Sequence, residues 1–262
     1  MIGQEKLVTK LKSYSITSLP HSMLFVGEVG CGKHTLVHEL EKYFNISTID
    51  VTDSLTYEMI EEIKLSVNNY FYIMDMNKVT ERQQNIILKF LEEPTTNAFL
   101  ILLTTSKSIL LDTIINRCMT FEFEPYSQDE LMQFLPFERE IEILVKYCHT
   151  PGQVLSMSVE KIKSLVELCD NIINKIGKSR FPNILRISQK TSKEDFNLDI
   201  FYNVLLERLE EYFIDTQNDV YSDMYNITSE ALKKHNDSRL NQEMLVDSLV
   251  IDLHEVSRGR IE

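Results

Sequence analysis

A glycine-rich loop between a short apolar run and an amphipathic stretch constrains this chain more than any other feature. Residues 23–26 are apolar and predict a buried strand, residues 27–33 hold three glycines and a lysine, and residues 35–44 predict a helix. In this order, glycines let backbone N–H groups turn toward an anion, and the N-terminus of the helix adds positive potential. Lys33 adds a point charge, so the stretch predicts a phosphate-binding loop.

The loop matches the Walker pattern of Gly, four residues and Gly-Lys-Ser/Thr except at its last position. His34 stands where the magnesium-binding hydroxyl is expected. It can be a substitute metal ligand or a solvated residue at the start of a helix, and the second interpretation is favoured. Thr35 supplies a hydroxyl only if the loop shifts by one residue, and a threonine in a first helical turn needs no such role. The candidate nucleotide contacts in the loop are Gly27, Gly30, Cys31, Gly32, Lys33, His34 and Thr35.

The bulk composition limits the classes of function. With 262 residues the chain can bury two or three small cores. Its net charge of −13 gives it no electrostatic reason to bind DNA, RNA or anionic lipid, so any work on nucleic acid needs basic partners. No apolar run approaches the roughly 20 residues of a membrane span, and the N-terminal residues lack the apolar core of a signal peptide. We therefore expect a cytoplasmic protein without membrane contacts.

Apolar runs alternate with helical patterns through the first half of the chain. Beyond the loop, the runs predict strands at 46–51, 70–74, 99–103 and 119–123, and the amphipathic stretches predict helices within 1–17 and at 56–67, 80–91 and 109–116. Such alternation is typical of a parallel sheet covered on both faces, with ligands at the carboxyl ends of the strands. Asp75 and Thr105 each follow one of these strands. We therefore expect both beside the loop at 27–33, and this convergence weighs more than any one motif.

After residue 125 the strand pattern disappears and helical periodicity takes over. Short helices are predicted at 129–135, 138–148 and 153–158, and long ones at 159–176, 195–215 and 225–256. The stretch 177–192, which holds a glycine, a proline and many polar residues, is the candidate hinge. The sequence therefore predicts three domains, with boundaries at 1–125, 126–158 and 159–262.

Several stretches match motifs of one protein family. Residues 2–4 read IGQ, residues 19–25 read LPHSMLF, residues 85–94 read NIILKFLEEP, residues 102–105 read LLTT, residues 113–118 read TIINRC, and residues 236–249 read NDSRLNQEMLVDSL. On these motifs the chain resembles the clamp-loader branch of the AAA+ ATPases, and within it the bacterial delta-prime and gamma/tau subunits of DNA polymerase III. The resemblance touches the chain from end to end and is firm over residues 1–125.

The resemblance implies an α/β P-loop AAA+ domain with a parallel sheet, then a small helical lid and an all-α collar domain that oligomerises. It implies a delta-prime-like subunit that helps to load a sliding clamp on primed DNA. The implied partners are a gamma/tau-like ATPase, a delta-like subunit, the clamp, and primed DNA only within the complex. ATP is the possible cofactor, with Mg²⁺ when it is bound. Zinc is not expected, because no cysteine lies between Cys31 and Cys118 to form the family's zinc-binding insertion.

The resemblance also assigns roles to residues outside the loop. It implies that residues 2–4 contact adenine and that Thr105 belongs to the sensor 1 strand. Arg117 would act as an arginine finger on the nucleotide of a neighbouring subunit, the alternative being a surface arginine beside Cys118. Glu92 and Glu93 are expected to shape the loop before Pro94 rather than to form a catalytic pair.

Three departures from the family pattern concern hydrolysis. An active member carries Asp-Glu at the end of the third strand, whereas here Asp75 is followed by Met76. His34 replaces the hydroxyl, and residues 150–153 read TPGQ without the sensor 2 arginine. Phosphoryl transfer relies on positioning and electrostatics, so we expect ATP binding at most, with weak or no intrinsic ATPase activity. Two alternatives stay open: an active gamma-like ATPase in which Thr35 and Asp75 hold magnesium, and a stand-alone AAA+ regulator.

Overall fold

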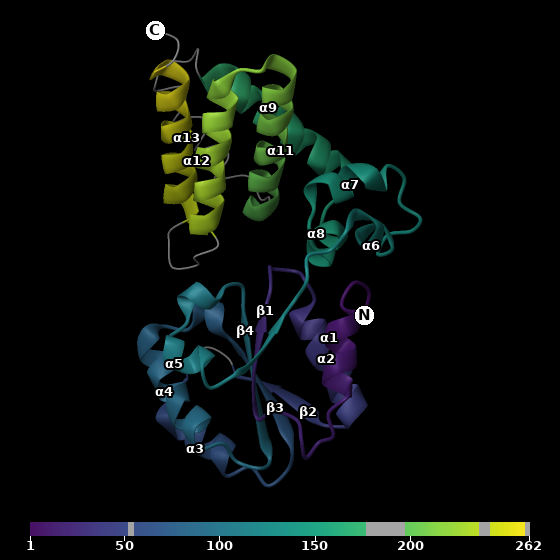
Figure 1. Cartoon of the computed structure of the whole chain (residues 1–262), viewed down its shortest axis with the longest axis vertical. Coiled ribbons are helices and arrows are strands. Elements are labelled where there is room, and N and C mark those ends of the chain that lie inside the picture. The colour runs from purple at the N-terminus through teal and green to yellow at the C-terminus, as the bar shows by residue number, and fades with distance from the viewer. Residues whose placement is uncertain (52–54, 177–196, 236–241, 260–262) are drawn as a thin grey trace. The chain divides into compact units, whose positions relative to one another are not determined.

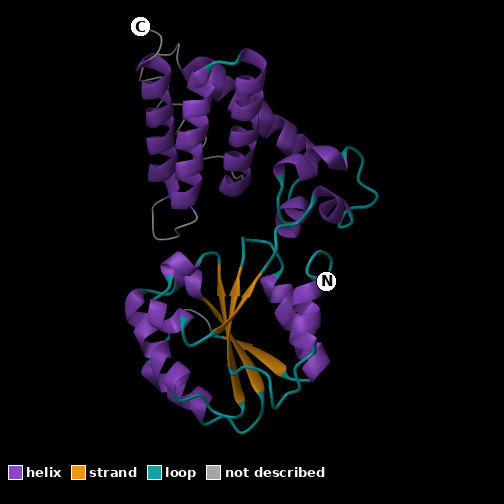
Figure 2. Ribbon diagram, viewed as in Figure 1, coloured by secondary structure: helices purple, strands orange, loops and turns teal. Residues whose placement is uncertain are grey.

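The computed structural model describes residues 1–51, 55–176, 197–235 and 242–259. It divides into two compact units, Met1–Gln133 with Thr150–Gly152 and Phe134–His149 with Gln153–Glu262. The first unit contains the sheet, and the second is helical (Figure 2). The division into three domains stays a proposal. The candidate hinge at 177–192 lies outside the described residues.

The first unit is built on a parallel sheet with the strand order β2-β3-β4-β1-β5. This confirms the predicted α/β class, and each strand lies within two residues of its predicted position. Every residue of the central strand β4 is buried, because helices cover both faces of the sheet. The strands are β1 (Ser22–Val26), β2 (Ser47–Asp50), β3 (Tyr70–Asp75), β4 (Ala98–Thr104) and β5 (Met119–Glu122).

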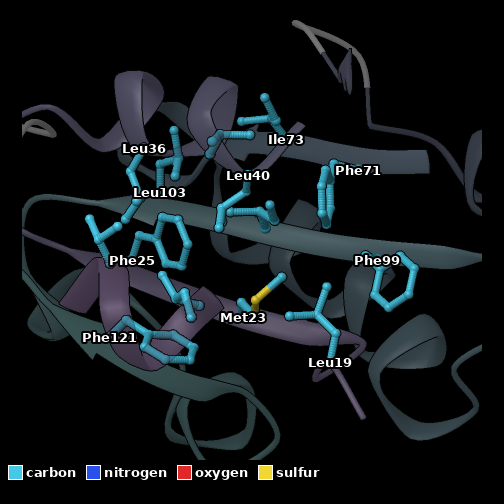
Figure 3. Packing of buried hydrophobic residues seen from close by; sticks show 14 of the residues in the cluster. Leu19, Met23, Phe25, Leu36, Leu40, Phe71, Ile73, Phe99, Leu103 and Phe121 are labelled. Carbon is cyan, nitrogen blue, oxygen red and sulfur yellow. The ribbon is translucent and has the colours of Figure 1, made fainter. Parts of the chain in front are cut away.

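Helices α1 (Glu5–Lys12) and α2 (Lys33–Phe44) cover one face of the sheet, and α3 (Tyr57–Lys64), α4 (Glu81–Glu92) and α5 (Asp112–Ile115) lie on the other (Figure 1). Successive side chains of a strand point to opposite faces of the sheet, so alternate residues pack into two separate cores. Phe25 packs with Leu36 and Leu40 of α2 (Figure 3). The preceding residue, Leu24, points to the other face of the sheet and packs with Phe90 of α4.

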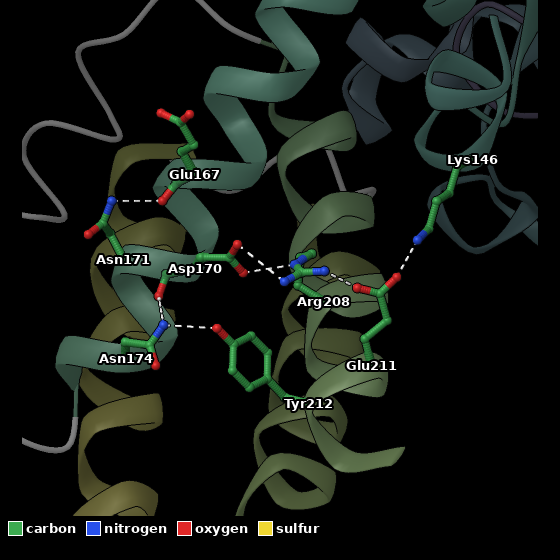
Figure 4. A network of polar contacts seen from close by, with 8 residues as sticks. All are labelled: Lys146, Glu167, Asp170, Asn171, Asn174, Arg208, Glu211 and Tyr212. Atoms are coloured by element: carbon green, nitrogen blue, oxygen red, sulfur yellow. Dashed lines mark hydrogen bonds and ion pairs between the residues drawn. The ribbon is translucent and has the colours of Figure 1, made fainter. Parts of the chain in front are cut away.

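The second unit consists of helices, and polar contacts join two of them (Figure 4). Arg208 on α11 (Leu198–Thr216) donates to the two carboxylate oxygens of Asp170 on α9 (Val159–Ile176) at 2.8 and 3.2 Å. Asn174 on α9 donates to Tyr212 OH on α11 at 2.9 Å. None of the described helices is long and apolar enough to cross a membrane. The helices after β5 are α6 (Gln128–Met132), α7 (Ile141–Tyr147), α8 (Pro151–Ser156), α9 (Val159–Ile176), α11 (Leu198–Thr216), α12 (Asp219–His235) and α13 (Gln242–Gly259).

Several predicted helix boundaries were wrong. The single helix expected at 225–256 is replaced by α12 and α13, and the residues 236–241 between them lie outside the described part of the chain. The helix expected from 138 begins only at Ile141, because Glu140 adopts a positive φ of 60°. Helix α8 begins at Pro151 rather than 153, since the fixed φ of proline suits a first helical turn. In place of a helix at 109–116 there is a 3₁₀ turn at Lys107–Ile109, followed by α5.

Candidate functional site

The residues predicted to line a nucleotide site meet at the carboxyl edge of the sheet. Val26 at the end of β1 pairs with Thr104 of β4, and Asp75 at the end of β3 pairs with Leu103. Gly27 and Thr105 follow directly in the chain, and the Gly27 N–H donates to Thr104 O at 3.1 Å. The structure therefore brings the loop, Asp75 and Thr105 together. Their roles stay predictions.

Lys33, the first residue of α2, is turned into its own loop. Its side chain is buried, and Nζ donates to Gly27 O, to Glu28 O at 2.8 Å and to Cys31 Sγ at 3.8 Å. An ammonium has three donors, so these contacts use all of them. Burial lowers the pKa of Lys33, although nearby Cys31 and Asp75 favour its charged form. A phosphate would have to displace these contacts, so the loop as it stands does not fit a bound triphosphate.

Residues 150–152, from the sensor 2 region, pack directly on the loop. Thr150 Oγ1 donates to Val29 O at 3.0 Å, and Gly152 N donates to Gly30 O at 3.0 Å. A Cβ added to Gly152 would lie 2.6 Å from Gly30 Cα, so the two backbones can approach this closely only with glycine. The loop is therefore closed on this side by backbone and a hydroxyl rather than by an arginine. Gln153, the residue at the place of that arginine, accepts a hydrogen bond from His149 N at 2.7 Å.

Tyr126 and the N-terminal residues lie against the loop from another side. Tyr126 OH donates to Cys31 O at 2.8 Å, and the tyrosine ring would be 2.7 Å from a Cβ added to Gly3. Burial raises the pKa of Tyr126 to about 12, so the phenol stays a hydrogen-bond donor at neutral pH. Gln4 does not project as a free amide: it donates to Glu124 O at 2.7 Å and accepts from Glu124 N at 3.1 Å.

The side chain of Asn77 connects Asp75 with Thr105. Asn77 Nδ2 donates to Asp75 Oδ1 at 2.7 Å, and Asn77 Oδ1 accepts from Thr105 N at 2.9 Å and Thr105 Oγ1 at 2.8 Å. Met76, at the place of the family's catalytic glutamate, is buried and has no carboxylate. Asp75 and the exposed His34 line a pocket of about 320 Å³ beside this network. The described residues contain no group of three or more His, Cys, Asp or Glu side chains able to hold a metal ion.

Three residues around the site were not among the predicted site members, although Thr150 belongs to the stretch compared with sensor 2. Tyr126 contacts Cys31, Thr150 contacts Val29 of the loop, and Asn77 contacts Asp75 and Thr105. Tyr126 is 95 positions from its partner in the loop, and Thr150 is 121 positions from its partner. No local sequence pattern encodes contacts between residues so far apart in the chain. Asn77 had a partial signal, because an aspartate side chain commonly accepts a hydrogen bond from the backbone two residues on, and Asp75 Oδ1 accepts one from Asn77 N at 3.1 Å.

Arg117 lies at the opposite edge of the sheet from the loop. It precedes β5, whose first residue Met119 pairs with Met23. Gly27 is four residues beyond Met23, so at ~3.3 Å per residue the loop begins about 13 Å further along the strand direction. The guanidinium points toward α4, where Nη2 donates to Glu92 Oε1 at 3.0 Å, and Nη1 donates to Thr113 O at 3.0 Å. Any role of Arg117 at a nucleotide therefore requires a second subunit.

Comparison with known proteins finds similarity to subunits of DNA polymerase III. A family model described as "DNA polymerase III, delta subunit" matches residues 45–127. The DNA polymerase III subunit gamma of Buchnera aphidicola subsp. Acyrthosiphon pisum is 24% identical over 52% of this chain and 48% of that protein. The DNA polymerase III subunit delta' of Bacillus subtilis is 23% identical over 67% of this chain and 57% of that protein. The chain thus spans about half the length of these relatives.

The fold agrees with a solved structure of more distant sequence. The RuvB Holliday junction branch migration motor of Thermotoga maritima superposes with a TM-score of 0.53 over 79% of this chain and 88% of that one, at 15% identity. At that identity the similarity concerns the fold alone. Together the comparisons confirm the resemblance to the clamp-loader branch of the AAA+ ATPases, with similarity to both delta-prime and gamma subunits.

Proposed function

We propose that this protein is a delta-prime-like subunit of a DNA polymerase III clamp loader. It helps to load the sliding clamp on primed DNA, hydrolyses little or no ATP itself, and offers Arg117 to the ATP of an adjacent subunit. The observation that carries this proposal is the loop in which all three donors of Lys33 are bonded to the loop itself. The missing carboxylate at Met76 and the sensor 2 region without an arginine support it from independent directions.

The chemistry of Arg117 then takes place in a neighbouring subunit. A guanidinium placed beside a transferring phosphoryl group stabilises the negative charge that develops there, and an arginine finger raises kcat by about 10³–10⁵. The position of Arg117 at the amino edge of the sheet supports this use in trans, because its own loop begins at the other edge. The partners are a gamma/tau-like ATPase, a delta-like subunit and the clamp. Because the net charge is −13, these partners supply most of the basic surface for DNA.

The test is a complex reconstituted with the gamma-like ATPase of the same source. Replacing Arg117 by Ala is expected to leave assembly intact and to lower steady-state ATP turnover, because the phosphoryl charge loses its cation. Arg82→Ala is the matched control, since Arg82 is an exposed arginine of the same unit at the start of α4. Unchanged turnover with Arg117→Ala would contradict the role in trans.

The alternative of an active gamma-like ATPase is tested on the isolated chain. The similarity to gamma subunits favours this alternative, and Asp75 lies close enough to Lys33 to favour its charged form. Turnover by the isolated chain that disappears with Lys33→Ala would establish this alternative and contradict the non-hydrolysing role. Purification together with a gamma-like ATPase and a clamp would exclude the stand-alone regulator.

A further inference from the structure

The guanidinium of Arg117 is held from two sides within the sheet unit. Nη2 donates to Glu92 Oε1 and Nη1 donates to Thr113 O, both at 3.0 Å. The Arg117 side chain is 36% exposed and that of Glu92 is 54% exposed, so both groups are open to solvent and to a partner. A guanidinium has five N–H donors, and these two contacts leave three of them for an incoming phosphate.

Three features where α4 ends beside α5 attract the guanidinium of Arg117. Glu92 contributes a carboxylate, and as the last residue of α4 it also marks the negative end of a 12-residue helix. The Thr113 carbonyl lies in the final turn of α5, where carbonyl groups accept bonds from outside the helix. The two contacts come from different helices, so they fix both the position and the direction of the guanidinium.

We propose that Glu92 is the positioning residue for Arg117 in the reaction of the neighbouring subunit. This rests on the proposed function of Arg117 in trans. A side chain that must meet a developing charge acts best when it is held near its working geometry before the substrate arrives. Glu92 does not touch the nucleotide. It acts through Arg117 by keeping the guanidinium extended toward α4, with three donors free.

The chain offers a matched control for the charge of Glu92. Glu93 is the next residue, at the C-cap of the same helix, and its side chain is 81% exposed. It pairs with Lys64 at 3.5 Å instead of with Arg117. Removing Glu93 therefore takes the same charge from the same helix end without touching the guanidinium.

The experiment measures ATP turnover in the complex reconstituted with the gamma-like ATPase. Glu92→Ala is expected to lower kcat about two- to five-fold, the factor by which an exposed ion pair biases a side-chain position, with the KM for ATP unchanged. Glu92→Gln keeps an oxygen that accepts the hydrogen bond, so it is expected to restore part of the loss. Glu93→Ala is expected to leave kcat unchanged. In an Arg117→Ala background, Glu92→Ala is expected to have no further effect, which a general structural role would not reproduce.

Each other outcome overturns the inference. A higher kcat with Glu92→Ala would mean that Glu92 withholds Arg117 from the nucleotide. An equal loss in the Arg117→Ala background, or a failure of the Glu92→Ala complex to assemble, would mean that Glu92 acts elsewhere. If Arg117→Ala lowers kcat and Glu92→Ala does not, the inference fails while the proposed function stands. If Arg117→Ala itself changes nothing, both fail.

Discussion

Residues 150–152 pack against the loop, and this contact makes Gly152→Ala an informative substitution. The helix preference of alanine predicts a higher free energy of unfolding, whereas packing predicts a lower one. Gly152 is the second residue of α8, and its φ is not positive. Alanine is better than glycine in a helix by about 1 kcal/mol, and it also restricts the unfolded chain. Local preference alone therefore predicts stabilisation by about 1 kcal/mol.

Packing predicts a loss instead. The added Cβ would lie 2.6 Å from Gly30 Cα and 3.1 Å from Gly30 O, and neither backbone atom can rotate away as a side chain can. Overpacking of this kind costs about 1–3 kcal/mol. The loop has to shift, which also weakens the hydrogen bond from Gly152 N to Gly30 O, worth about 0.5–1.5 kcal/mol. After the local gain is subtracted, we expect a net loss of about 0.5–3.5 kcal/mol.

Urea denaturation of the full chain, followed by circular dichroism, measures this difference. Ser156→Ala is the control, because Ser156 is exposed at the other end of α8, and a change within about 0.5 kcal/mol is expected there. A stabilised Gly152→Ala protein would refute the reasoning, since it would mean that residues 150–152 do not close on the loop.

Two further predictions concern the buried side chains of the two units. Lys33→Met leaves the carbonyls of Gly27 and Glu28 without their donor, so the free energy of unfolding in urea should fall by about 1–3 kcal/mol. An unchanged midpoint would show that these bonds do not form. Burial raises the pKa of the Cys148 thiol from 9.0 to about 12, so above pH 9 the thiol ionises in the unfolded chain and not in the folded one. Stability should therefore fall as pH rises, by about 1.4 kcal/mol per unit from this group, and Cys148→Ala should remove that part of the slope.

The α/β class could be predicted from the sequence because the apolar runs of the strands and the amphipathic pattern of the helices between them were both clear. The strands carry nearly unbroken apolar runs, as at 70–74 and 99–103, and the helix predicted at 80–91 begins where Thr80 forms a capping box with Gln83. The helical half was harder. One helix was predicted over 225–256, although residues 233–243 hold a single apolar residue, and this polar run was the sequence signal for the end of α12 at His235.

The candidate site could also be predicted only in part: the sequence predicted which residues lie at the site, but not where their side chains point. The placement of Asp75 and Thr105 near the loop follows from the parallel direction of the strands, because all strands of a parallel sheet have their carboxyl ends on one side. The direction of a side chain does not follow from strand order. Lys33 has its donors turned into the loop, and Arg117 pairs with Glu92, because of contacts that only the folded chain creates.

The register of β1 has a consequence for the order in which the chain can fold. Ser22 pairs with Leu100 and Met23 pairs with Met119, which are 78 and 96 positions further along the chain. At a synthesis rate of about 5–20 residues per second, this apolar strand leaves the ribosome about 5–20 s before its second neighbour exists. Both of its edges stay unpaired until β4 is made, and one edge stays unpaired until β5 is made; such edges promote pairing with other chains. The strand that carries the loop is thus the part of the nascent chain that most needs protection by a chaperone.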